Sequence, residues 1–206
     1  MKNGPIYFIF NIFIEGLKYI SLVEFFKFLA VYFFYRNDSD DKKSIARRWA
    51  VDFFILAKWI LIIYAMNISL TNTYFTILIW YLIFTNLYTY FYYHIWHKNA
   101  MNTESFLIDR VRRRFITLIL SIGFSNLCFA YFIRYPYNTD FVWTDKKLST
   151  IQAICFSCAN SLTADYPKIN ASTNIGFQIT IVQLIISFVF LTLILGKTLP
   201  QTTSTT

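Results

Sequence analysis

The sequence predicts an all-α membrane protein with about four transmembrane helices, and three observations lead to this fold class. Hydrophobic residues make up 56% of the 206 residues and charged residues only 15%, against roughly 25% charged residues in an ordinary soluble domain. The mean hydropathy is +0.46. Four segments contain the run of about 20 mostly apolar residues that a helix needs to cross a bilayer. They are residues 51–70, 74–96, 115–133 and 175–195.

The N-terminal apolar region, residues 6–35, differs from these four spans because it contains four charged side chains. The charges form two acid–base pairs at i,i+3 spacing, which favours a helix. The pairs are Glu15 with Lys18 and Glu24 with Lys27. We expect an amphipathic helix in the membrane interface, in two pieces broken near Gly16. A fifth membrane span is the alternative.

The distribution of basic residues predicts the orientation of the chain. Residues 36–50 and 97–114 contain most of the lysines and arginines between spans, so both are expected on the cytoplasmic side. The third span then runs outward, residues 134–172 begin outside, and the fourth span returns the C-terminus to the cytoplasm. The chain is rich in Lys, Ile, Phe, Asn and Tyr, which we interpret as a bacterial composition. The expected location is therefore the bacterial cytoplasmic (inner) membrane, with several crossings.

The stretch between the last two spans has the order of a pore loop. Residues 148–159 form a short apolar helix candidate, residues 160–167 are polar, and the long apolar segment 175–195 follows. A re-entrant loop has this order: a short helix enters the bilayer and the backbone turns back through a water-lined gap. Irregular backbone at membrane depth is tolerated only where protein or water satisfies its N–H and C=O groups. The sequence therefore predicts a re-entrant pore-loop helix.

With these elements, residues 115–199 resemble the pore module of the potassium-channel superfamily, with its outer helix, pore helix, filter and inner helix. The family filter reads T-x-x-T-V-G-Y-G-D and is followed by a proline. Aligning Asp165 with the family's aspartate places Pro167 close to that proline. The filter-like positions are then Asn160, Ser161, Leu162, Thr163, Ala164 and Asp165. The resemblance implies a homotetramer around a central pore.

The departures from the family pattern concern the two filter glycines, which are replaced by Leu162 and Ala164. Glycine reaches positive φ at little cost, so without it we expect no potassium-type ladder of carbonyl oxygens. Side-chain oxygens of Asn160, Ser161 and Thr163 are expected to line the pore instead, with a ring of Asp165 carboxylates. This arrangement predicts a weakly selective cation channel. The alternative is a module that keeps the architecture and does not conduct.

In size and four-span organisation the chain is also similar to small membrane subunits of bacterial antiphage defence operons, such as the membrane partner in Kiwa, although no motif carries this likeness. It implies a non-conducting membrane sensor or scaffold that recruits a cytoplasmic protein effector. Four arginines form the densest basic cluster and are candidates for contact with that partner or with anionic lipid. They are Arg110, Arg112, Arg113 and Arg114. As a simpler interpretation, the cluster only determines topology.

Other classes of function find little support in the sequence. The net charge is +8, and the basic residues lie beside apolar spans. We therefore expect them to contact the membrane surface and expect no direct nucleic-acid partner. We expect no catalytic constellation, no metal site and no cofactor, and hence no enzyme. The spacing of Cys155 and Cys158 fits a redox pair, but their apolar context favours packing.

The expected organisation has four parts. Residues 1–50 form the interfacial helix and a linker, and residues 51–114 form a peripheral two-span hairpin with a basic loop. Residues 115–199 form the pore-loop module, and residues 200–206 a disordered tail. Because no regulatory domain is expected after the last span, gating would come from a partner or the membrane.

Overall fold

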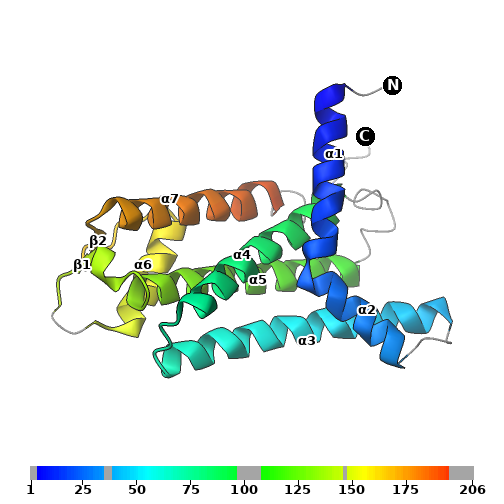
Figure 1. Ribbon diagram of the computed structural model, residues 1–206, viewed down its shortest axis with the longest axis horizontal. Helices are drawn as coiled ribbons and strands as arrows, with labels where there is room; N and C mark the ends of the chain where they lie inside the picture. The colour runs from blue at the N-terminus through cyan, green and yellow to red at the C-terminus, as the bar shows by residue number, and fades with distance from the viewer. Residues whose placement is uncertain (1–3, 35–38, 97–107, 146–147, 195–206) are drawn as a thin grey trace. The chain divides into compact units, whose positions relative to one another are not determined.

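The computed structural model describes residues 4–34, 39–96, 108–145 and 148–194. These residues are mostly helical (Figure 1). Within these ranges, four helices are long and apolar enough to cross a membrane, which confirms the four spans expected from the sequence. They are Asp40–Asn67, Thr73–Phe91, Arg112–Arg134 and Asn174–Thr192.

The chain divides into two compact units, Met1–Ile60 and Leu61–Thr206. The first contains α1 (Pro5–Leu17) and α2 (Leu22–Phe34), which are joined by a 3₁₀ turn and bent by 55°. Ser21 has extended backbone, and its carbonyl accepts the N–H groups of the first turn of α2. The break therefore lies at Ser21, whereas Gly16, where it was expected, lies inside α1.

Within this first unit, aromatic side chains pack α2 against the neighbouring part of α3 (Asp40–Asn67). The ring of Phe26 lies 5.4 Å from that of Phe54 and 6.4 Å from that of Phe53. Lys27 and Glu24 form an ion pair of 2.7 Å on α2, which bears out one of the two expected i,i+3 pairs. The interfacial placement of α1 and α2 stays a prediction.

Two segments expected as cytoplasmic linkers are partly helical. Residues 36–50 were expected to link two elements, but α3 already begins at Asp40. Asp40 and Asp41 stand in its first turn, where negative charge is favourable to the helix dipole, and Lys43 lies 3.9 Å from Asp40. Similarly, α5 (Ile108–Arg134) begins inside the expected loop 97–114, of which residues 97–107 lie outside the described ranges.

The second unit contains the remaining helices. α4 (Thr73–Phe91) continues as a π-helical turn to Trp96, and α5 is followed by a 3₁₀ turn (Asn138–Asp140). Then come β1 (Phe141–Trp143), α6 (Thr150–Ser161), β2 (Ile169–Ala171) and α7 (Asn174–Phe188), which continues as a π-helical segment to Ile194 (Figure 1). β1 and β2 pair antiparallel, with Phe141 opposite Ala171. This small sheet was not expected from the sequence.

The C-terminal end of α5 is tied to the turn between α3 and α4 by two tyrosines. The hydroxyl of Tyr131 donates to the carbonyl of Leu70 at 2.8 Å, and that of Tyr135 to the carbonyl of Met66 at 2.5 Å. Asn72 caps the start of α4 by accepting from Tyr74 N at 2.8 Å. The two tyrosine bonds satisfy carbonyls of the α3 end and of the turn after it, and the Asn72 bond satisfies an N–H of the first turn of α4. The turn is therefore held against α5.

Candidate functional site

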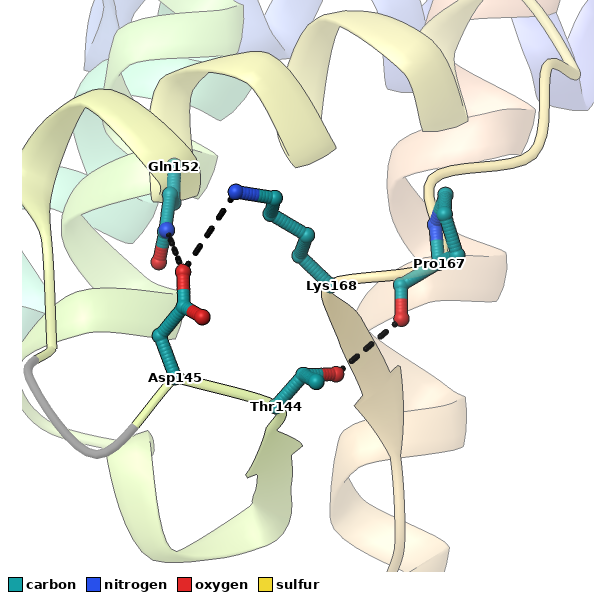
Figure 2. Close-up of polar contacts among 5 residues, drawn as sticks. All are labelled: Thr144, Asp145, Gln152, Pro167 and Lys168. Atoms are coloured by element: carbon teal, nitrogen blue, oxygen red, sulfur yellow. Dashed lines mark hydrogen bonds and ion pairs between the residues drawn. The ribbon is translucent and has the colours of Figure 1, made fainter.

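The segment that carries the filter-like residues begins and ends at the β1–β2 pair (Figure 2). The N–H of Thr144 donates to the carbonyl of Lys168 at 2.9 Å, and its hydroxyl donates to the carbonyl of Pro167 at 3.2 Å. The segment from residue 144 to residue 168 therefore begins and ends at the same place, beside the first turn of α7. We call this segment, which contains α6, the α6 excursion.

The first turn of α7 is fixed to the 3₁₀ turn after α5 (Asn138–Asp140) by a tight contact at Gly176. Thr173 caps α7 by accepting from Gly176 N at 3.2 Å, and its hydroxyl donates to the Asp140 carboxylate at 2.6 Å. A methyl group at Gly176 would overlap the carbonyl oxygen of Asp140. Glycine is required here for the close approach of two backbones.

α6 packs alongside α5 and runs from the C-terminal end of α5 toward its middle. Near its start, the hydroxyls of Thr150 and Tyr135 lie 3.4 Å apart. At its end, Ser161 accepts a hydrogen bond of 3.3 Å from Asn126 on α5. Asn126 precedes Arg134 by eight residues (134 − 126), or about 12 Å at 1.5 Å per residue. The C-terminal end of α6 is therefore level with the middle of α5.

A polar cluster of five side chains joins α5, α6 and α7 at this level. Its centre is Gln183 of α7, whose side chain is fully buried. The Gln183 amide donates to the hydroxyl of Ser157 at 2.7 Å and to its carbonyl at 2.8 Å, and accepts from Asn160 at 3.0 Å. Ser157 in turn donates to the carbonyl of Asn126 at 2.8 Å. The cluster consists of Asn126, Ser157, Asn160, Ser161 and Gln183.

Three members of the polar cluster were not among the expected site residues: Asn126, Ser157 and Gln183. For Asn126 and Gln183 the sequence did contain a signal, because an amide side chain in an apolar span is costly unless it is paired between helices. The sequence pattern could mark them as internal, but it contained no information about which partners they would meet.

The six filter-like residues do not share one surface. Asn160 and Ser161 point into the unit, where Asn160 also donates to the carbonyl of Thr180 at 3.2 Å. They belong to the last turn of α6, so the expectation that their oxygens line a pore is not met in this structure. The exposed members are Leu162, Thr163, Ala164 and Asp165.

α6 ends in a left-handed cap at Thr163. The N–H of Ala164 donates to the carbonyl of Ala159 at 2.8 Å, and that of Thr163 to the carbonyl of Asn160 at 3.0 Å, which is the Schellman pattern. Thr163 has a φ of 57° and Leu162 a φ of −100°. The turn therefore uses one left-handed residue, Thr163, which lies between Leu162 and Ala164.

An exposed carboxylate lies near the start of α6. Gln152 Nε2 donates to Asp145 Oδ2, and Lys168 Nζ lies 3.4 Å from the same oxygen (Figure 2). The hydrogen bond from Gln152 and then the positive charge of Lys168 hold the pKa of Asp145 below its ordinary value of 3.8. These contacts connect β1, α6 and β2 at the base of the excursion.

The expected basic cluster lies on the first turns of α5. Arg112 is exposed, and Arg113 and Arg114 are half-buried, while the Arg110 side chain lies outside the described part of the structure. Cys155 and Cys158 are both exposed on α6, although their apolar context had favoured packing. Across the described ranges, no three His, Cys, Asp or Glu side chains lie together as a metal site would require.

The four apolar helices, with polar side chains paired between them, are compatible with a multi-pass helical membrane protein. No protein-family model, curated protein sequence or solved structure matches the chain.

Proposed function

We propose that this protein is a homotetrameric pore-loop membrane protein that conducts monovalent cations with weak selectivity, gated by a partner or by the membrane. The observation that carries this proposal is the position of α6. Its two flanks are paired at one end of the unit, while its C-terminal end is hydrogen-bonded to the middle of both neighbouring helices.

The depth of this end follows from helix geometry. Gln183 follows Asn174 by nine residues (183 − 174), or about 13 Å along α7, and Asn126 lies at a similar distance from the end of α5. If α5 and α7 cross a hydrocarbon layer of about 30 Å, the C-terminal end of α6 lies near its middle. This supports a re-entrant loop.

The residues just after the C-terminal end of α6 support an assembly of several subunits. Leu162 to Asp165 are exposed and lie outside any helix or strand, apart from the helix cap. Such backbone cannot face lipid tails, since its polar groups would have no partners. Symmetric copies around an axis would enclose these four residues in a water-filled space.

Two features support cations as the permeant ions. The C-terminal end of a helix carries partial negative charge, and α6 points this end at the proposed axis. Asp165 is exposed three residues beyond the helix cap at Leu162 and would add one negative charge per subunit. With one left-handed residue and no carbonyl ladder, poor discrimination between sodium and potassium is expected.

The test is flux through liposomes containing purified protein, with particle mass measured in lipid nanodiscs. We expect a tetramer, passage of both sodium and potassium, and lower preference for cations over anions in Asp165→Asn. A monomer or dimer would overturn the assembly. Unchanged selectivity in Asp165→Asn would remove that residue from the permeation path, and protein that never conducts would leave only the second candidate.

The second candidate is a non-conducting sensor or scaffold that recruits a cytoplasmic effector, for example in antiphage defence. It is favoured by the inward orientation of Asn160 and Ser161, which leaves Leu162, 66% exposed, among the residues facing the proposed axis. Arg112, Arg113 and Arg114 are then the proposed contact for the effector or for anionic lipid. Replacing all three with glutamine should leave assembly intact and weaken this binding in a salt-sensitive manner.

Two further parts of the proposal concern membrane placement. α1 runs across the direction of the first part of α3 (Figure 1), which supports an interfacial position for α1 if α3 crosses the bilayer.

The basic residues of α3 and α5 support a cytoplasmic position for the first turns of these two helices, and hence for the C-terminus. We place the protein in the bacterial cytoplasmic membrane.

A further inference from the structure

Gln183 has a role that the proposed channel architecture does not itself require. Its side chain belongs to α7 and is fully buried, and it forms hydrogen bonds to the two neighbouring helices α6 and α5. Two go to Ser157 and one comes from Asn160, both on α6, at 2.7, 2.8 and 3.0 Å. A weaker contact of 3.4 Å leads to Asn126 on α5.

We infer that Gln183 is a positioning residue that holds the C-terminal end of α6, and with it the exposed residues Leu162 to Asp165, in register with α7. The inference rests on the proposed function for its consequence on conduction, but its structural part stands independently. A movement of α7 would be transmitted through this amide to the end of α6. The same link would allow a change at the end of α6 to displace α7.

The bonding pattern shows why the amide is needed rather than a side chain of similar size. Ser157 Oγ already donates its hydrogen to Asn126, so it can only accept from Gln183. Asn160 donates, so it requires an acceptor. Only a side chain that both donates and accepts satisfies these two neighbours. A carboxylate cannot donate, and methionine offers no N–H or carbonyl.

The first experiment measures the position of the α6 end without using conduction. A cysteine is placed at Leu162 in a background with Cys155→Ala and Cys158→Ala, and its reaction rate with a small water-soluble thiosulfonate is followed in nanodiscs. Gln183→Met, which keeps the volume and removes three hydrogen bonds, should change this rate by about fivefold or more, since the loss of even one hydrogen bond of ordinary net strength changes a local opening equilibrium by about that factor.

Ser187→Ala is the matched control. Ser187 is buried four residues further along the same face of α7, and the change should leave the labelling rate within about twofold, as expected for removal of a group outside the polar cluster. If Gln183→Met does not assemble, Ser157→Ala cuts the same link from the α6 side with a smaller change. Labelling rates that match the parent in every assembled variant would overturn the positioning role.

The second experiment uses ion flux to separate the two proposals. Gln183→Met should alter the sodium-to-potassium permeability ratio while the tetramer mass stays that of the parent, whereas Ser187→Ala should leave both unchanged. A parent protein that never conducts would overturn the proposed channel, and the labelling result would still decide the role of Gln183. A conducting Gln183→Met protein with unchanged labelling and permeability ratio would overturn the inference and leave the channel in place.

Discussion

At the scale of single residues, the unit Leu61–Thr206 depends on polar side chains placed in apolar surroundings. Tyr131 and Tyr135 donate to backbone carbonyls of the α3–α4 turn, and Gln183 bonds to α6. In a membrane, such bonds contribute on average about 0.6 kcal/mol each. Their main effect is specificity, because each polar group is satisfied in only one arrangement of the helices.

Gly176 is the residue for which the structure makes the clearest prediction of stability. Gly176→Ala places a methyl group against the carbonyl oxygen of Asp140, and backbone must move to relieve the overlap. We expect a loss of roughly 1–3 kcal/mol in the free energy of unfolding, typical of overpacking, measured by thermal unfolding in detergent. Gly16→Ala is the control, since no atom lies within 4 Å of its added methyl group. Equal effects of the two substitutions would contradict the close approach at Gly176.

Asp145 provides a prediction of pH dependence. Its pKa in the folded protein is lowered, first by the hydrogen bond from Gln152 and then by the charge of Lys168. A carboxyl group with a depressed folded pKa stabilises the fold above its unfolded pKa, and this contribution is lost as the pH falls through the folded value. We expect an NMR titration of the Asp145 carboxyl to give a pKa below 3.8.

The two causes can be separated in the same titration. Gln152→Leu should raise the pKa of Asp145 more than Lys168→Met does, because the hydrogen bond from Gln152 is the larger cause. A titration at or above the ordinary value in the parent protein would show that the contacts at the base of the α6 excursion do not form.

At the scale of elements, helix ends decide where the chain turns. α6 stops because Thr163 adopts the left-handed conformation and Ala164 N caps the carbonyl of Ala159. α3 stops in the same manner, with Ser69 at a φ of 53° and Leu70 N bonded to the carbonyl of Ala65. Neither end has the glycine that usually occupies this position, which is why the exact turns were not evident in the sequence.

Thr163→Gly tests the cap of α6. A β-branched residue pays about 1–2 kcal/mol in the left-handed region, and glycine recovers it at some entropic cost in the unfolded chain. From these two opposed effects we expect Thr163→Gly to raise the free energy of unfolding by roughly 0.5–1 kcal/mol, measured by thermal unfolding. Leu162→Gly should destabilise instead, because Leu162 has a negative φ and no strain to relieve. Stabilisation by Leu162→Gly and not by Thr163→Gly would place the turn one residue earlier.

At the scale of the whole molecule, the topology can be tested through the two flanks of α6. Thr139 lies before β1 and Ser172 after β2, and both are near Asp140, which is bonded to Ser172 N at 2.9 Å. Single cysteines at Thr139 and at Ser172 should therefore label from the same side of the membrane, the outer side. A cysteine at Arg112 should label from the cytoplasm.

The outcome distinguishes a re-entrant excursion from a crossing. Labelling of Thr139→Cys and Ser172→Cys from opposite sides would mean that the segment between them crosses the bilayer, which the β1–β2 pairing does not permit. Labelling of both from the cytoplasm would preserve the excursion and reverse the orientation derived from the basic residues.

The sequence by itself determined the features that depend on local composition. Long apolar runs predicted the four helices now found at Asp40–Asn67, Thr73–Phe91, Arg112–Arg134 and Asn174–Thr192, because burying or solvating a span in lipid requires about 20 apolar residues wherever it occurs. A short apolar stretch at residues 148–159 likewise predicted α6, displaced by only two residues.

Only the tertiary structure decided which polar residues face one another. Asn160 and Ser161 resembled filter positions in sequence, but Gln183 and Asn126 draw them inward, and these partners lie on different helices. The β1–β2 pair also joins residues distant in the chain, such as Phe141 and Ala171, which are 30 positions apart (171 − 141). Such pairings depend on contacts that are distant in the chain, so no local pattern specifies them; a buried amide is satisfied only when the whole set of helices is in place.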